Sequence, residues 1–145
     1  MKNFYKDAEL EQMTFHDCPI WGFSFGGRKD ESYPYADLIF DIDYIFEWVK
    51  KGDKFDFIIS PCTLVFKNAW KLKANFDTCG FALDAVQILG VKREKILSGF
   101  FKYEISLSCC GEGASISFEA QAVEMSVRKA PIVSEAQLLP AGLRK

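Results

Sequence analysis

The strongest constraint on the fold is a regular alternation of apolar and polar residues between residues 36 and 48. The apolar positions are Ala36, Leu38, Phe40, Ile42, Tyr44, Phe46 and Trp48. Because successive side chains of a β-strand point to opposite faces, one face of this segment is wholly apolar and the other is mixed and acidic. A helix would scatter the same residues around its circumference. The pattern therefore predicts a strand, and its length indicates a bend or a bulge within it.

A second alternating run, residues 62–76, carries the opposite charge on its polar face, where Lys67, Lys71 and Lys73 lie. Opposite charges on neighbouring strands form favourable cross-strand pairs. We therefore expect the two runs to belong to one sheet, with their charges on its outer side. Pro61 precedes the second run and is expected to break or kink the chain, because proline cannot donate to a sheet ladder.

The other segments predict the same kind of structure. Residues 18–25 form a short strand rich in aromatic residues, and residues 101–109 and 116–122 alternate on either side of a Gly-Glu-Gly turn at 111–113, which is typical of a hairpin. Short helical turns are expected near residues 5–13 and 81–86. The sequence predicts one all-β domain spanning residues 1–145, an antiparallel β-sandwich or a strongly curved sheet of about eight strands.

Composition excludes several classes of protein. With 145 residues and 49% hydrophobic content the chain can bury a core, and a net charge of −2 argues against nucleic-acid and membrane surfaces as partners. The first residues have no apolar signal core, which predicts a cytoplasmic protein. In that compartment the five cysteines stay reduced, and their odd number fits free thiols.

Several short motifs resemble a family of small, uncharacterised bacterial all-β proteins. They are His16-Asp17-Cys18, Asp41-Ile42-Asp43-Tyr44-Ile45 and Pro61-Cys62-Thr63-Leu64-Val65-Phe66. The resemblance runs from about His16 to Pro131. The His-Asp start followed by alternating strands is also similar to some toxin-immunity proteins. The resemblance implies a bacterial, single-domain protein and assigns no catalytic residue.

The candidate binding face consists of carboxylates and the single histidine. It comprises His16, Asp17, Asp37, Asp41, Asp43 and Glu47. Carboxylates spaced by two residues share one face of a strand, where they bind a cation, divide acid and base roles, or simply pair with lysines of the next strand. Asp17 is expected to orient His16 only where the chain turns, because adjacent residues of a strand point to opposite faces.

No catalytic residue, metal site or cofactor site is assigned from the sequence. One histidine with scattered cysteines falls short of a zinc site, and the chain has no nucleophile motif. Trp21, Trp48 and Trp70, with the many phenylalanines, suggest either a plain core or an aromatic ligand cavity.

Three functions therefore remain open, and the first does not require an enzyme. The leading hypothesis is a cytosolic protein-binding domain, immunity-like or antitoxin-like, whose acidic face occludes a toxin. An exposed edge strand would also allow a homodimer. The second is a β domain that binds a small molecule in an aromatic cavity. The third is a metal-dependent hydrolase that uses His16, Asp17, Asp41 and Asp43.

Overall fold

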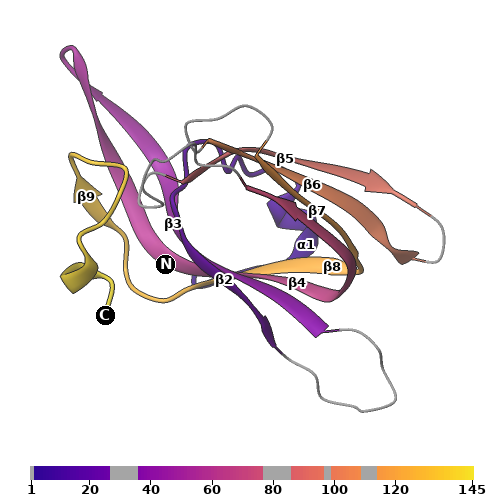
Figure 1. Ribbon diagram of the computed structural model, residues 1–145. Helices are drawn as coiled ribbons and strands as arrows, with labels where there is room; N and C mark the ends of the chain where they lie inside the picture. The colour runs from indigo at the N-terminus through magenta and orange to yellow at the C-terminus, as the bar shows by residue number, and fades with distance from the viewer. Residues whose placement is uncertain (1, 27–35, 77–85, 97–98, 109–113) are drawn as a thin grey trace.

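A computed structural model describes residues 2–26, 36–76, 86–96, 99–108 and 114–145. The helical turn predicted at 81–86 falls almost wholly outside these residues, as does the turn at 111–113. The described chain forms a single antiparallel sheet of nine strands that curls strongly, as Figure 1 shows. The predictions of an all-β class and a strongly curved sheet are confirmed.

The two alternating runs form the longest strands, β3 (Ala36–Lys51) and β4 (Lys54–Asn75). They pair antiparallel from Ala36 opposite Ala69 to Lys51 opposite Lys54. Gly52 has a positive φ of 65°, a left-handed conformation that glycine adopts without steric cost at this tight turn. The register shifts between Ile45 and Glu47, so β3 carries the bulge that its length predicts.

The curl arises because β4 has different neighbours along its length. Its first two thirds pair with β3 on one side and with β8 (Ala122–Val127) and β9 (Ile132–Ser134) on the other. Its last residues pair with β7 (Ser115–Ala120), which leads to β6 (Phe101–Ser108) and β5 (Gln87–Lys95). β1 (Phe4–Tyr5) lies beside β8, and β2 (Ile20–Gly26) lies beside β3.

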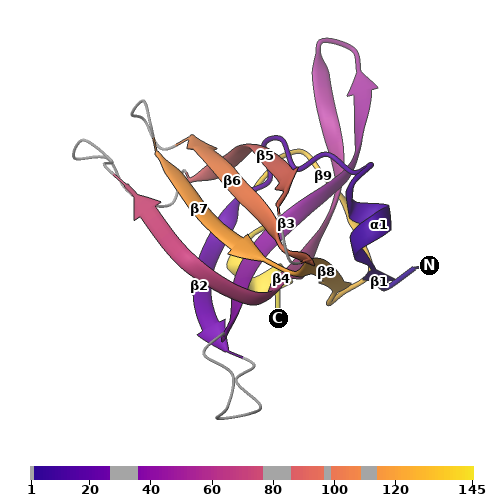
Figure 2. The ribbon, with the colours of Figure 1, turned by 90° about the vertical axis from the view of Figure 1, so that its right-hand side faces the viewer.

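The chain entering β2 joins the β5 edge of the sheet. The Asp17 N–H donates to the Ile88 carbonyl at 2.7 Å, and the Ile88 N–H donates to the Cys18 carbonyl at 2.9 Å. The Ile20 N–H continues this ladder by donating to the Val86 carbonyl at 3.0 Å. The sheet therefore closes on itself around an apolar core, and its concave side faces inward (Figures 1 and 2).

The alternation of β4 holds through Phe66 and then fails. Leu64 and Phe66 are buried, whereas Trp70, Leu72 and Phe76 are exposed by more than a third of their surface. Asn68 and Lys71 adopt positive φ angles of 51° and 54°, and the register with β7 shifts between Trp70 and Lys73. The prediction of one apolar face along the whole run is wrong for its last third, because these irregularities rotate the strand.

Pro61 does not break β4, contrary to expectation. It lies opposite Asp43 of β3, and the Asp43 N–H points away from it and donates to the Pro19 carbonyl at 3.1 Å. Asp43 and Pro61 are therefore a pair without mutual hydrogen bonds. The Pro61 carbonyl accepts from the Arg128 N–H, where the neighbouring chain passes from β8 to β9. The missing donor of proline falls at this gap in the ladder, so the strand continues.

Helical structure is short. α1 (Asp7–Leu10) confirms the helical turn expected within residues 5–13, and η3 (Ala141–Leu143) is a single 3₁₀ turn near the C-terminus. α1 lies at one open end of the curled sheet (Figure 2). None of the helices in the described ranges has the length and apolar character needed to cross a membrane.

Candidate functional site

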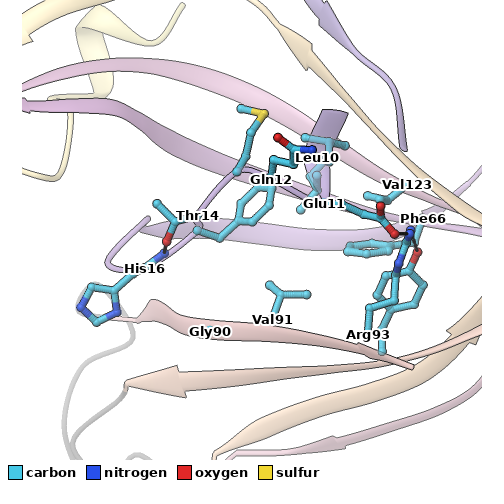
Figure 3. A pocket seen from close by; sticks show the side chains of 14 residues that line it. Leu10, Glu11, Gln12, Thr14, His16, Phe66, Gly90, Val91, Arg93 and Val123 are labelled. Atoms are coloured by element: carbon cyan, nitrogen blue, oxygen red, sulfur yellow. Dashed lines mark hydrogen bonds and ion pairs between the residues drawn. The ribbon is translucent and has the colours of Figure 1, made fainter. Parts of the chain in front are cut away.

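A cavity of about 700 Å³ lies between the N-terminal segment and the concave side of the sheet. Residues 10–16 form one wall, and Figure 3 shows β5 opposite them. The sheet supplies the rest of the lining, which comprises Leu64, Phe66, Gly90, Val91, Arg93, Tyr103 and Val123. We call this space the α1 cavity. Its lining mixes apolar side chains with the polar or charged side chains of Glu11, Gln12, Thr14, His16 and Arg93.

The N-terminal wall is held by packing at both of its ends. Leu10, the last residue of α1, is buried in the core. Phe15 packs edge-on against Tyr44 with ring centroids 5.2 Å apart, and it is also nearly buried. The residues between these two anchors lie across from β5, and the cavity lies between them and the sheet.

Arg93 of β5 fixes the α1 end of the cavity. Its Nη1 donates to both carboxylate oxygens of Asp7, at 2.7 and 2.8 Å, and its Nη2 donates to Glu11. The guanidinium also lies 3.9 Å from the ring centre of Phe101. Burial alone would lower the pKa of Arg93, but hydrogen bonds to Asp7 and Tyr103 outweigh it and raise the pKa. Arg93 therefore stays charged in this partly apolar setting.

His16 and Asp17 lie together at the other end of the cavity. The His16 Nε2 is 3.4 Å from the Asp17 carboxylate, and its Nδ1 is 3.0 Å from the Leu89 carbonyl. Asp17 was expected to orient His16 only where the chain turns. The chain does turn here, with a φ of 65° at Asp17. His16 lines the cavity but is more than half exposed.

Three carboxylates of the predicted binding face, those of Asp37, Asp41 and Asp43, are engaged by other parts of the chain. Asp37 accepts from the Asn68 N–H at 3.0 Å and lies 3.5 Å from the Lys67 Nζ, which joins β3 to β4 by the predicted cross-strand pair. Lys71 pairs with Glu119 of β7 instead of a β3 carboxylate. Glu47 lies beyond the bulge and is exposed.

Asp41 and Asp43 lie under the C-terminal segment, where they bind arginines. Arg144 donates to Asp41 at 2.6 and 3.1 Å and to Asp43 at 2.7 Å, and Arg128 donates to Asp41 at 2.5 Å. Asp43 is fully buried and also accepts from the Trp21 indole at 2.8 Å and from the Leu139 N–H at 2.9 Å. The two carboxylates are therefore neutralised within the chain.

Partial burial would raise the pKa of Asp41, but the hydrogen bonds from Arg144 and Arg128 outweigh it and lower the pKa. Asp41 is thus an ionised partner of these arginines. No cluster of three or more His, Cys, Asp or Glu side chains suited to a metal ion is present in the described part of the chain.

The predicted tryptophans do not line the α1 cavity. Trp21 contacts the Arg144 guanidinium on the outer side of the sheet, and Trp48 packs on Phe55 and Phe57 in the β3–β4 hairpin. Phe15, Phe66 and Tyr103 supply the aromatic lining instead. The sequence carried one signal for these residues: Phe66 and Tyr103 lie on the apolar sides of alternating runs.

Arg93 was missed as a site residue because its segment has no clear period in the sequence. Its partners Asp7 and Glu11 are more than 80 residues away, so no local pattern joins them. Arg93 stands in the charged run Lys92-Arg93-Glu94-Lys95, where one arginine is at most a weak signal of a buried ion pair.

Comparison with known proteins gives no relative. No protein family, no curated protein and no solved structure matches the chain. The resemblance to small bacterial proteins and immunity proteins therefore stays a prediction from short motifs.

Proposed function

We propose that this protein binds a small, largely apolar molecule in the α1 cavity. The observation that carries the proposal is the cavity itself, about 700 Å³ in a domain of 145 residues. Protein interiors are close-packed, and pockets for small ligands usually measure roughly 300–1,000 Å³. A space of this size, lined by both apolar and polar side chains, lies within that range.

The charged side chains and the histidine of the lining lie at its two ends, and Gln12 and Thr14 lie between them. Arg93 and Glu11 meet near α1, and His16 lies at the opposite end (Figure 3). Val91 offers apolar surface between them, and Phe66 and Val123 do so beside Arg93. Burying the apolar part of a ligand against these side chains gains about 25 cal/mol for each Å² removed from water. The polar ends then orient the ligand.

The test is binding of Nile red, a neutral apolar dye, measured by fluorescence titration of the wild type and two variants. Val91→Phe places a ring in the cavity and is expected to weaken binding by about tenfold, a loss of ~1.4 kcal/mol. Val133→Phe adds the same ring at an exposed position of β9 and leaves binding unchanged. Equal binding by all three proteins would show that the dye binds elsewhere and would remove the proposal.

A second candidate, a protein-binding role such as the immunity-like one, is favoured by the β3–β4 hairpin. This hairpin extends beyond the body of the sheet in Figure 1 and exposes Trp48, Val49 and Phe55. Exposed aromatic side chains of this kind are typical of interfaces. The acidic face suits this role less well, because Asp41 and Asp43 already bind arginines of the same chain.

This candidate is tested with the proteins encoded next to its gene. Each is purified and titrated against the wild type, and against a double variant, Trp48→Ser with Phe55→Ser. A binary complex that the double variant loses, and that Leu89→Ser on β5 retains, supports the role. A complex that the double variant forms as tightly as the wild type contradicts the role.

A further inference from the structure

We infer that the molecule bound in the α1 cavity is an amphiphilic carboxylate, whose carboxylate takes the place of Glu11 on the Arg93 guanidinium. This inference rests on the proposed function, because it names the ligand class of the same cavity. It begins from the charges around the cavity. The ionisable groups of its described lining are Glu11, His16, Arg93 and the Tyr103 phenol, and Arg93 is the permanent cation among them.

Arg93 is held in place without help from Glu11. Only 15% of its side chain is exposed, its Nη1 is bound by Asp7, and its guanidinium lies over the Phe101 ring. A planar guanidinium fixed in this way presents its remaining N–H groups in one direction, which suits a carboxylate. Loss of the Glu11 contact therefore leaves a preformed receptor for an anion.

Asp7 and Glu11 differ in what else they do. Asp7 also accepts the Val123 N–H at 2.9 Å, begins α1, and is not part of the cavity lining. Glu11 lines the cavity, 55% of its side chain is exposed, and within the described ranges Arg93 is its hydrogen-bond partner. Asp7 belongs to the fold, whereas Glu11 holds the position that a ligand carboxylate would occupy.

The exchange preserves the charge at Arg93 and costs little. Glu11 is the exposed partner, with 55% of its side chain open to water, so water solvates its carboxylate once it leaves the largely buried Arg93. Glu11 released from Arg93 moves into solvent, and the incoming carboxylate accepts the same N–H groups. The net charge in contact with Arg93 does not change, because the ligand carboxylate replaces that of Glu11.

The apolar lining defines the other half of the ligand. From Arg93 the cavity extends along Val91 toward His16, as Figure 3 shows, with Phe66 and Val123 beside Arg93. A carboxylate without an apolar tail would leave this surface uncovered, and an apolar molecule without a carboxylate would leave Glu11 in place. An acid with an unbranched or aromatic tail satisfies both parts.

The experiment is displacement of Nile red at pH 7.5 by decanoate, 1-decanol and decylamine, which share a tail and differ in charge. We expect decanoate to bind the wild type most tightly. Glu11→Gln removes the internal competitor and should raise decanoate affinity by about two- to fivefold while leaving 1-decanol unchanged. Glu94→Gln is the matched control. Glu94 follows Arg93 in β5, and adjacent side chains of a strand point to opposite faces, so this change should leave decanoate affinity as in the wild type.

The possible outcomes separate the inference from the proposed function. If decanoate and 1-decanol bind alike and Glu11→Gln changes neither affinity, or if decylamine binds most tightly, the carboxylate inference is overturned and the cavity remains a binding site. If none of the three displaces the dye and Val91→Phe has no effect on dye binding, the proposed function fails as well. Glu11→Lys adds a further check, because it should favour decanoate and disfavour decylamine.

Discussion

The carboxylate of Asp43 and the guanidinium of Arg144 meet at 2.7 Å, although 101 residues separate them in the chain. Asp43 is fully buried on the outer side of the sheet, beneath residues 139–144. A buried carboxylate is costly unless it is paired and hydrogen-bonded. The pair therefore holds the C-terminal segment against β3.

Replacing Arg144 with Gln should destabilise the protein by about 3 kcal/mol, because it leaves the buried Asp43 without its charged partner. Urea unfolding followed by circular dichroism measures the loss. Arg128→Gln removes an arginine that contacts Asp41 at a half-exposed position, so it should cost less than about 1 kcal/mol. Equal losses in the two variants would contradict the burial argument.

Asp41 should make stability depend on acid pH. Its pKa is lowered in the folded state by Arg144 and Arg128, against the effect of its partial burial. Such a carboxyl stabilises the protein above its unfolded pKa of about 3.9, and this contribution is lost as the pH falls through the lower folded value. The stability gap between wild type and Asp41→Asn, measured by urea unfolding, should therefore be smaller at pH 3 than at pH 6.

Glu47→Gln is the matched control for this titration. Glu47 is an exposed carboxylate of the same strand, so its effect on unfolding should be small at both pH values. A gap for Asp41→Asn that widens in acid would show that the arginines do not stabilise the ionised carboxylate.

The thiols of Cys18 and Cys62 should be inert in the native protein. Burial raises the pKa of each to about 12, and the thiolate is the reactive form. Treatment with iodoacetamide at pH 8 should leave both unmodified in the folded protein and modify both in urea, as peptide mass spectrometry would show. Because the folded pKa is raised, stability is full below the unfolded pKa of about 8.5 and falls as the pH rises toward 12.

Sequence periodicity predicts the strands because it depends on local geometry. Leu38, Phe40, Ile42 and Tyr44 are all buried, as the alternation predicts. The same reasoning fails after Phe66, because the positive φ angles at Asn68 and Lys71 depend on how β4 passes from β3 to β7. No residue type at those positions requires that turn of the strand, so the exposure of Trp70 was not predictable.

The candidate sites were less predictable than the fold, since their partners are distant in sequence. The expectation that lysines of the second run pair with carboxylates of the first is met at Lys67 and Asp37, because these residues lie on neighbouring alternating strands. Arg144 lies in a tail without a period, and Arg93 in a segment of unclear period, so their carboxylate partners could not be chosen from spacing. The α1 cavity depends on where residues 10–16 cross the sheet, which only the three-dimensional structure defines.

Asp7 should anchor α1 to the sheet. Its Oδ1 accepts both the Arg93 Nη1 and the Val123 N–H, so one side chain joins α1 to β5 and β8. Asp7→Ala removes both bonds and leaves the Val123 N–H, in a buried residue, without its acceptor, which should cost about 1–3 kcal/mol. Hydrogen exchange should show faster exchange of the Val123 amide and of the α1 amides, while the Ile88 amide, bonded to Cys18, stays protected.

Glu11→Gln is the control for this anchor. It removes a carboxylate from the same guanidinium, but Glu11 accepts no backbone N–H in the described structure and is more than half exposed. In this variant the Val123 and α1 amides should therefore exchange as in the wild type. If Glu11→Gln and Asp7→Ala release α1 equally, the two carboxylates share the anchoring role, and Glu11 would no longer be free to yield its place on Arg93 to a ligand.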